Sequence, residues 1–306
     1  MDAQKAIRSL ALVHKPLPEV VALVGTVKAW LEERGCTVAT FPNTADVRFE
    51  TRDIDAVVAF GGDGTMLGVA RRLTSRPIPV LGVNLGSVGF LTEINVKDWQ
   101  PALERFVRGQ YRLIKRMALR WKVWREGRLV SEGHAVNDAV MSRGALSRVV
   151  RFGVKAGGQD ICTVRADGLI ISSPMGASGY AVSAGGPLVH PALPAVVITP
   201  ICPFLCNFPP LVLPLSLPVR VETLSSSVQT FLTLDGQRTV SLAPYDVVEV
   251  SGERKLVHYA RIGEGTYFKR LKARGFIEDY VHSAPQAPCA PDAPCAPDAL
   301  DARRQA

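Results

Sequence analysis

Hydrophobic and polar positions follow two alternating patterns along the first third of the chain. Short apolar runs predict β-strands, and the run at residues 55–60 is so nearly all apolar that burial on both faces is indicated. Segments with the 3.6-residue spacing of amphipathic helices lie between these runs. Strands that alternate with helices predict an α/β domain with a parallel sheet. The strands are expected at residues 9–13, 36–41, 55–60 and 78–86, and the helices at 18–34, 64–73 and 98–108.

The period of the pattern changes near Tyr111. Residues 117–124 alternate between apolar and polar, which is typical of a half-exposed strand. Residues 149–168 indicate two strands joined by a Gly-Gly hairpin turn. Short β segments broken by Pro and Gly continue to about Tyr259, so a mostly antiparallel β domain is expected to follow the α/β domain. A short helical pattern comes after it, at residues 266–274.

These changes divide the chain into four parts. We expect an α/β domain at residues 1–110, a β-rich domain at 111–262, a helical segment at 263–282 that packs back on the first domain, and a tail at 283–306. The tail repeats the sequence APCAPD and is rich in Pro and Ala. Because it has almost no large apolar side chains to bury, we expect it to be disordered.

The composition is that of a globular protein with an excess of positive charge. The chain has 306 residues, of which 47% are hydrophobic and 21% charged, and its formal net charge is +8. This surplus suits anionic partners such as phosphates, nucleotides or nucleic acid, although a solvated basic surface would give the same charge. No apolar run approaches the roughly 20 residues of a membrane-spanning helix, and the N-terminus lacks the pattern of a signal peptide, so we expect a cytoplasmic protein.

The six cysteines do not predict a disulfide framework. Several are scattered among apolar residues, where buried thiols are common. Cys202 and Cys206 form a single C-x-x-x-C with no second pair and no nearby histidine, which argues against a zinc site.

The sequence AFGGDGTML at residues 59–67 places one carboxylate in a glycine-rich stretch at the end of a predicted strand. Glycine lets the backbone approach a ligand closely, and the N–H groups at the start of a following helix can hold a polyphosphate. Asp63 could hold Mg²⁺ or take a proton from an attacking hydroxyl, while an ordinary Gly-Asp-Gly turn is the alternative. The phosphate loop is expected at Gly61, Gly62, Gly64 and Thr65.

Several common nucleotide and hydrolase motifs are missing from the sequence. It contains no G-x-x-x-x-G-K-[ST], and hence no Walker lysine, and no G-x-G-x-x-G. The sequence GASG at residues 176–179 falls short of the G-x-S-x-G elbow of serine hydrolases. These absences disfavour a hydride-transfer Rossmann domain and a serine hydrolase.

Three further stretches carry polar groups that suit a ligand. NLGSVGFLTE at residues 84–93 is a second glycine-rich strand end that can lie beside the first. Asn137 and Asp138 place an amide and a carboxylate in a β stretch, where burial is costly unless a ligand or a tight turn satisfies them. Residues 165–191 are rich in Gly and Ser and include Tyr180, so they can contact sugar and base edges, although a loop-rich β connection is the alternative.

Taken together, these stretches resemble the NAD kinase family over about residues 9–274. GGDGT alone is less specific, because 6-phosphofructokinases and diacylglycerol-type lipid kinases carry similar loops. NLGSVGFL, ND, DGLIISSPMGASGYAVSAGGPLVHP and LDGQ in this order are more specific. The resemblance implies a phosphofructokinase-like α/β domain with a parallel sheet, a mostly antiparallel β domain, and an active site between them. It also implies transfer of the γ-phosphoryl group of ATP to the 2′-hydroxyl of the adenosine ribose of NAD, with Mg²⁺ or another divalent ion.

The resemblance carries roles to individual positions. Asp63 is implied as the general base, with Gly64 beside the dinucleotide, and Asn137 and Asp138 are implied to hold adenosine. Asp167 is implied to bind a ribose or the nicotinamide side. The other implied NAD contacts are Arg148, Arg165, Gln237 and the segment of Ser178, Gly179, Tyr180, Ala181, Val182 and Ser183.

The chain departs from the family pattern at a few positions. Phe204 and Pro209 stand where the family commonly has a histidine and an arginine, and Asp138 replaces the commoner glutamate. These differences bear on affinity and ribose contacts. Two alternatives stay open: a lipid or sugar-phosphate kinase that shares the GGDGT loop, and a dinucleotide-binding sensor with weak catalysis. The expected partners are NAD and ATP, in a homodimer or homotetramer, with neither nucleic acid nor membrane.

Overall fold

The computed structural model describes residues 4–44, 53–76, 78–86, 89–144, 149–205, 207–224, 228–263 and 265–278. The chain divides into two compact units, residues 1–264 and 265–306. Arg148, Cys206 and the predicted disordered tail lie outside the described residues.

The N-terminal part of the first unit is the predicted α/β arrangement. Four strands form a parallel sheet in the order β2-β1-β3-β4, and a two-residue strand, β5, extends it beside β4. The strands are β1 (Ser9–His14), β2 (Thr37–Pro42), β3 (Ala56–Phe60), β4 (Val80–Asn84) and β5 (Ile94–Asn95). The helices are α1 (Pro18–Glu32), α2 (Asp63–Arg72), the 3₁₀ turn η1 (Val96–Asp98) and α3 (Trp99–Val107).

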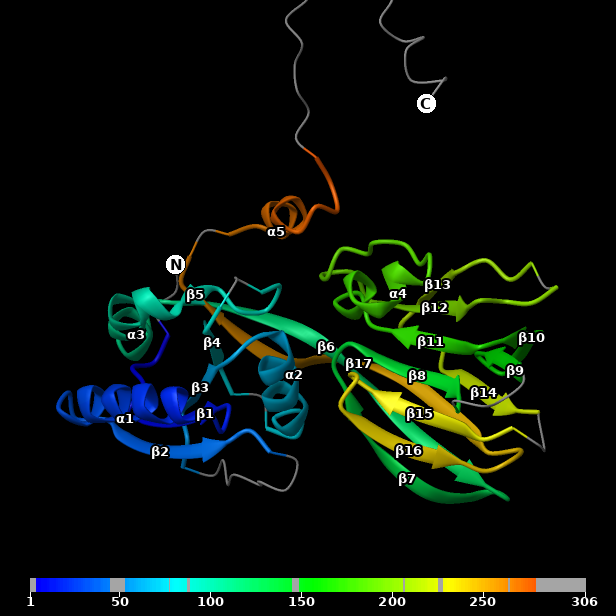
Figure 1. Cartoon of the computed structure of the whole chain (residues 1–306), viewed down its shortest axis with the longest axis horizontal. Helices are drawn as coiled ribbons and strands as arrows, with labels where there is room; N and C mark the ends of the chain where they lie inside the picture. The colour runs from blue at the N-terminus through cyan, green and yellow to red at the C-terminus, as the bar shows by residue number, and fades with distance from the viewer. Residues whose placement is uncertain are drawn as a thin grey trace, which may run out of the picture. The chain divides into compact units, whose positions relative to one another are not determined.

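Alternate residues of the central strands decide which helices cover each face of this sheet. On β1, Leu10 and Leu12 pack with α1 and α3, while Ala11 and Val13 face the cluster that contains α2. The same alternation along β3 explains why all five of its residues are buried. Helices α1 and α3 therefore cover one face and α2 covers the other (Figure 1).

The rest of the unit consists mainly of antiparallel strands. The long strands β6 (Arg112–Arg125) and β17 (Val247–Arg261) pair with each other, and β17 also meets β4 in parallel at Tyr259 and Val80. One eleven-stranded sheet among the described residues thus continues from the parallel strands into the antiparallel ones. Its other strands are β7 (Arg128–Ala135), β9 (Val150–Ala156), β10 (Gln159–Ala166) and β14 (Val219–Thr223).

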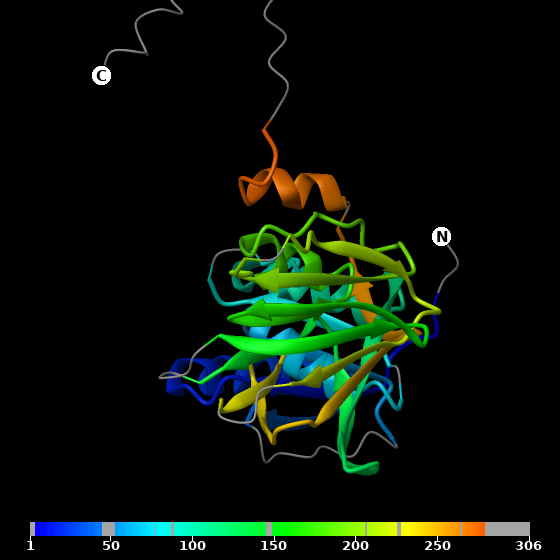
Figure 2. The ribbon, with the colours of Figure 1, turned by 90° about the vertical axis from the view of Figure 1, so that its right-hand side faces the viewer.

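A second sheet of six described strands packs against the antiparallel end of the first (Figure 2). Its order is β13-β12-β11-β8-β15-β16, and one large apolar cluster, with Trp121, Phe152 and Leu169 at its core, fills the space between the two sheets. The strands are β8 (Asp138–Arg143), β11 (Gly168–Ser172), β12 (Ala195–Ile201), β13 (Leu211–Pro214), β15 (Thr230–Leu234) and β16 (Arg238–Leu242). The 3₁₀ turn η2 (Gly176–Ser178) and the short helix α4 (Tyr180–Ser183) follow β11.

The predicted fold class, an α/β part followed by a mostly antiparallel β part, is confirmed. In the second unit, α5 (Tyr267–Ala273) begins after Thr266, whose hydroxyl accepts a hydrogen bond from the Lys269 backbone N–H at 3.3 Å. The predicted packing of this segment on the α/β domain stays a prediction. No helix in the described part of the chain is long and apolar enough to span a bilayer.

Candidate functional site

The GGDGT loop lies at the carboxyl end of β3, and Asp63 is the first residue of α2. Gly61 N–H donates to the carbonyl of Val83 on the neighbouring strand β4 at 3.0 Å, which holds the loop to the sheet edge. The carbonyl of Gly62 accepts hydrogen bonds from Thr65 and Met66, so the helix starts immediately after the glycine pair. In an α/β sheet this edge is where ligands gather, and the first helical turn carries free N–H donors.

Asp63 connects the first glycine-rich loop to the second. Its Oδ2 accepts a hydrogen bond from the N–H of Phe90 at 2.8 Å, and its Oδ1 accepts one from Leu91 at 2.9 Å. Gly89 allows this approach, because a Cβ built on it would lie 2.0 Å from Asp63 Oδ1. The sequence predicted that the two loops lie side by side, and these contacts bring them together.

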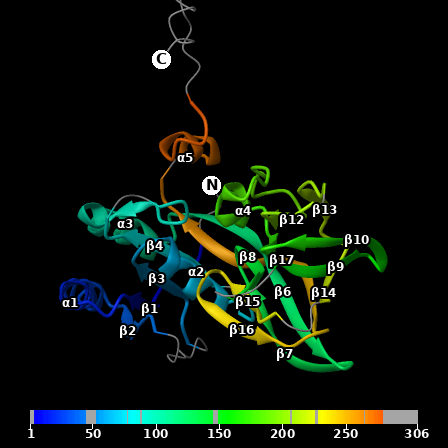
Figure 3. The same cartoon turned by 45° about the vertical axis from the view of Figure 1, so that its right-hand side comes forward.

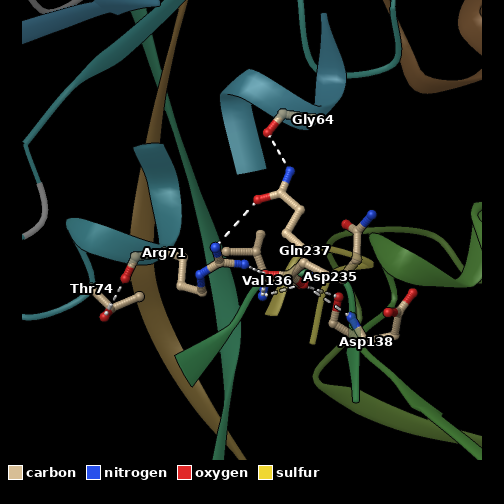
Figure 4. Close-up of polar contacts among 9 residues, drawn as sticks. Gly64, Arg71, Thr74, Val136, Asp138, Asp235 and Gln237 are labelled. Carbon is tan, nitrogen blue, oxygen red and sulfur yellow. Dashed lines mark hydrogen bonds and ion pairs between the residues drawn. The ribbon is translucent and has the colours of Figure 1, made fainter. Parts of the chain in front are cut away.

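Asp235, in the LDGQ turn between β15 and β16, anchors the segment before β8. Its buried carboxylate accepts N–H donors from Val136 at 2.9 Å, Asn137 at 2.7 Å and Asp138 at 3.3 Å. Arg71 of α2 donates to the same carboxylate at 3.2 Å (Figure 4). A single side chain therefore ties the β-rich part of the unit to the helix that follows the GGDGT loop.

Gln237 makes the second link between these parts. Its Nε2 donates to the carbonyl of Gly64 at 2.6 Å, and its Oε1 accepts from Arg71 at 3.3 Å (Figure 4). The turn between β15 and β16 accordingly lies beside α2 (Figure 3). The predicted residues Asp63, Gly64 and Gln237 are thus close to one another, while Arg71 and Asp235 are neighbours that motif matching did not single out.

The loop after β11 is fixed against Asn137. Ser173 donates from its hydroxyl to the carbonyl of Val136 at 2.7 Å and from its N–H to the carbonyl of Asn137 at 2.8 Å. Asn137 lies just before β8 rather than inside a strand, and Asp138 is the first residue of β8. Among the described residues, Asn137 Oδ1 is buried without a hydrogen-bond partner, which is uncommon for a buried polar atom.

Gly176 sets the distance between this loop and Asn137. A Cβ on Gly176 would lie 2.1 Å from the carbonyl oxygen of Asn137 and within 2.7 Å of two further backbone atoms of that residue. With NAD as the acceptor that the family resemblance implies, we expect Gly176→Ala to push the loop away and to raise the KM for NAD about tenfold, because small misplacements at a binding site are costly. Steady-state kinetics with varied NAD measures this.

Gly25→Ala provides the matched control for this substitution. Gly25 lies in α1, and a Cβ there would meet no atom within 4 Å. The control should leave the KM for NAD unchanged and stabilise the helix by up to about 1 kcal/mol. An unchanged KM in Gly176→Ala would show that this close approach does not position the site.

Asp138 is a buried carboxyl beside a second buried carboxyl. Burial, together with the smaller effect of the charge of Asp235, raises the pKa of Asp138 to about 7. Asp235 itself has its pKa raised by burial, against the lowering effect of its N–H donors and Arg71. Near neutral pH, Asp138 can therefore either accept a hydrogen bond or donate one.

This raised pKa predicts a pH dependence of stability. Between its ordinary value of 3.8 and about 7, the Asp138 carboxyl keeps its proton in the folded chain but loses it in the unfolded chain. Stability from this group is therefore greatest below that window and falls as the pH rises through it. Since Asp138→Asn cannot titrate, wild type should lose about 2–3 kcal/mol relative to the variant between pH 5 and pH 7. Urea unfolding at several pH values measures the difference, and parallel curves would contradict it.

The predicted Ser178–Ser183 segment lies partly beside Asn137. A Cβ on Gly179 would come 3.8 Å from Asn137 Nδ2, and Ser178 donates to the carbonyl of Met175 at 3.1 Å. Ala181, within α4, is buried against Val140 and Ile170. The remaining members point outward to different degrees: Tyr180 and Ser183 are exposed and Val182 is half-buried.

Asp167 and Arg165 lie at the other end of these strands. The pairing of β11 with β8 sets Ser172 opposite Asp138 and Gly168 opposite Ser142, so Asp167 is roughly 15 Å from Asp138. Asp167 forms an ion pair with Arg143 at 2.8 Å. The guanidinium of Arg165 lies 5.3 Å from the ring centre of Phe204. Phe204 and Pro209, which stand where the family commonly has a histidine and an arginine, are both exposed. Within the described part of the chain, Asp167 and Arg165 are therefore not brought together with Asp63, Gly64 and Gln237.

The described residues contain no cluster of three or more His, Cys, Asp or Glu side chains that could hold a metal ion. Mg²⁺ commonly binds through substrate phosphates with one or two carboxylates, so a divalent ion that enters with ATP fits these residues.

A carboxylate on a glycine loop at a helix start, joined through Gln237 and Asp235 to a segment with a buried and unpaired amide oxygen, fits a nucleotide-binding site of the phosphotransferase class. The model of the ATP-NAD kinase N-terminal domain matches residues 35–111, and that of the ATP-NAD kinase C-terminal domain matches residues 136–261. The chain belongs to the NAD kinase family.

Curated relatives agree over most of the chain. The NAD kinase of Nitratidesulfovibrio vulgaris (strain DP4) is 44% identical over 283 residues, which cover 91% of this chain and 95% of that protein. The NAD kinase of Oleidesulfovibrio alaskensis is 45% identical over 260 residues, covering 84% of this chain and 89% of that protein.

Two solved structures share the fold. Yeast NADH kinase complexed with NADH has a TM-score of 0.81 at 23% identity, covering 92% of this chain and 91% of that one. An NAD kinase from Archaeoglobus fulgidus in complex with ATP has a TM-score of 0.68 at 24% identity, covering 87% of this chain and 98% of that one.

Proposed function

We propose that this protein transfers the γ-phosphoryl group of ATP to the 2′-hydroxyl of the adenosine ribose of NAD, producing NADP and ADP. The observation that carries the proposal is the set of contacts by which Gln237 and Asp235, in one turn, join Gly64 of the Asp63 loop to the segment with the unpaired Asn137 Oδ1. Relatives named NAD kinase and a structural neighbour solved with ATP support the same reaction.

Asp63 is the proposed general base. Each of its carboxylate oxygens accepts one backbone N–H, which fixes its orientation and leaves further lone pairs for a ribose hydroxyl. The carboxylate takes the hydroxyl proton as the ribose oxygen bonds to the γ-phosphorus. The bond from that phosphorus to the bridging β–γ oxygen breaks, and ADP leaves with the electron pair.

The charge on the transferred group needs stabilisation that a Walker lysine would otherwise supply. The proposed sources are the N–H groups of the phosphate loop at Gly61, Gly62, Gly64 and Thr65 and a divalent ion, such as Mg²⁺, that enters with ATP. Arg71 lies beside this loop and adds positive charge. Holding both substrates next to one carboxylate provides the proximity that the reaction requires.

Adenosine recognition is proposed for Asn137, Asp138 and the Ser178–Ser183 segment, with the exposed ring of Tyr180 available for stacking. Asp167 and Arg165 keep their proposed roles as NAD contacts only if they serve a site other than the one on their own chain, and Arg148 keeps its proposed role as an NAD contact. That condition agrees with the predicted homodimer or homotetramer, in which one subunit contributes to the site of another. Oligomeric state and cytoplasmic location stay predictions.

Incubation of the protein with ATP, Mg²⁺ and NAD, followed by enzymatic detection of NADP, tests the proposal. Parallel reactions with sugar phosphates and diacylglycerol as acceptors test the lipid or sugar-phosphate kinase. NAD binding without turnover would favour the dinucleotide sensor. The proposal requires NADP formation that depends on both ATP and NAD.

A further inference from the structure

Ser172, the last residue of β11, carries a buried hydroxyl that none of the site contacts uses. The side chain is fully buried, and among the described residues its Oγ has no hydrogen-bond partner. The next residue, Ser173, differs, because its hydroxyl donates to the carbonyl of Val136 and accepts the N–H of Gly176. A buried hydroxyl without a partner is costly, so the polar groups within reach of Ser172 are of interest.

Strand pairing places Ser172 directly opposite Asp138 of β8. Their chain neighbours Ile171 and Ala139 pack into the core between the two sheets. Ser172 and Asp138 therefore share the opposite face of their sheet, the one on which α4 lies. Directly opposite residues of antiparallel strands have Cβ atoms about 4.5–5.5 Å apart, a separation that a hydroxyl and a carboxyl can span with one hydrogen bond.

Asp138 has a fixed backbone but a side chain that nothing orients. Its N–H donates to the Asp235 carboxylate at 3.3 Å (Figure 4), and its carbonyl accepts the Asp235 N–H at 3.0 Å. Within the described part of the chain, no hydrogen bond reaches the Asp138 carboxyl itself. The charged side chain that acts on it is Asp235, whose like charge repels it, and Arg71 bonds to Asp235 instead. Ser172 is therefore the polar side chain placed to orient this carboxyl.

We infer that Ser172 is a positioning residue for Asp138: rotation about its Cα–Cβ bond lets its hydroxyl donate to one carboxylate oxygen, which leaves the other directed toward the nucleoside. This inference rests on the proposed function, in which Asp138 contacts adenosine. Because Ser172 is fully buried, it acts on the substrate only through Asp138.

Thr199 of β12 provides a matched control for Ser172. Its hydroxyl is also fully buried and has no hydrogen-bond partner among the described residues. The residue opposite it on β11 is Ile170, so no carboxyl faces it across that strand. Thr199→Val therefore removes a comparable hydroxyl from the same sheet without affecting Asp138.

Ser172→Ala in the full-length chain, with Thr199→Val as control, tests the inference. Ser172→Ala should raise the KM for NAD about 3- to 10-fold and leave kcat and the KM for ATP within about twofold, because it misplaces a binding contact and not the reacting groups. Thr199→Val should leave all three constants unchanged. In an Asp138→Ala background, Ser172→Ala should add no further change, because no carboxyl is left to position.

A second measurement needs no substrate. A hydroxyl bonds to a carboxylate more strongly than to a neutral carboxyl, so its loss should raise the pKa of Asp138 above about 7. Since the folded pKa exceeds the unfolded value, stability from this group falls as the pH rises and stops falling above the folded pKa. In urea unfolding, that fall should therefore extend about one pH unit higher in Ser172→Ala than in wild type or Thr199→Val.

Both measurements must change for the inference to hold. A raised KM with an unmoved pH range would show that the hydroxyl does not act through Asp138. A moved pH range with an unchanged KM would show that the hydrogen bond does not position Asp138 for the nucleoside. Either result overturns the inference, as would equal effects in Thr199→Val. Ser172→Cys, with a similar shape and a weaker donor, replaces Ser172→Ala if the latter does not fold.

The proposed function can fail separately. If wild type makes no NADP, calorimetric titration with NAD takes the place of the kinetics, while the unfolding measurement is unaffected. Weaker NAD binding in Ser172→Ala than in Thr199→Val, together with the moved pH range, would then support the positioning role. Equal binding, or no binding in wild type, would overturn it.

Discussion

Replacing Asp63 by Asn is expected to lower kcat about 10²- to 10⁴-fold, the effect of losing a general base. An amide cannot take the ribose proton at neutral pH. It also offers one acceptor oxygen where the carboxylate offers two, so one of the N–H groups of Phe90 and Leu91 loses its partner. The stability should therefore fall by about 1–2 kcal/mol as well. Steady-state kinetics and urea unfolding measure the two effects.

The two effects of this substitution can be separated. Asp98→Asn makes the same chemical change at an exposed position before α3 and should alter neither quantity. If Asp63 only positioned the two loops, Asp63→Asn would raise the KM for NAD and ATP while kcat stayed within a few-fold of wild type. Full activity in the variant would remove Asp63 from the mechanism.

The positions of several elements follow from local pattern, although each strand takes its backbone hydrogen bonds from neighbouring strands. The apolar run at residues 55–60 becomes β3, which is buried on both faces, and the GGDGT sequence starts α2 within one residue of the expected position. The Gly-Gly pair at residues 157–158 turns β9 into β10 as predicted. Periodicity and turn chemistry decide these features without long-range information.

The assembly of the candidate site depends on contacts that local pattern does not encode. Asp235 bonds to residues 97–99 positions earlier, and Arg71 reaches it across 164 positions. The LDGQ motif singled out Gln237. The structural role of the motif's aspartate, Asp235, depends instead on which strand ends lie next to each other in the folded chain. Asp167 shows that residues of one motif can also be far apart in the fold. It precedes β11, whereas Ser178 and Gly179 follow the opposite end of that strand.

Asp235→Asn is expected to reduce the free energy of unfolding by about 3–5 kcal/mol, as for the loss of one member of a buried ion pair. The fully buried carboxylate accepts three backbone N–H groups and an Arg71 donor, and an amide would direct its own N–H₂ toward some of them. The pKa of Asp138 should also fall, since the charge of Asp235 is the second cause of its elevation. Urea unfolding measures the stability, and its pH dependence reports the change at Asp138.

Asp246→Asn is the matched control, because Asp246 is equally buried and pairs with Arg125 at 2.9 Å at a distance from the candidate site. Both variants should lose stability, but only Asp235→Asn frees Arg71 and the segment of residues 136–138. Its folded fraction, assayed at low temperature, should therefore show raised KM values for both NAD and ATP, while Asp246→Asn keeps wild-type values. If the two variants showed the same KM values, Asp235 would stabilise the fold without joining the two sides of the site.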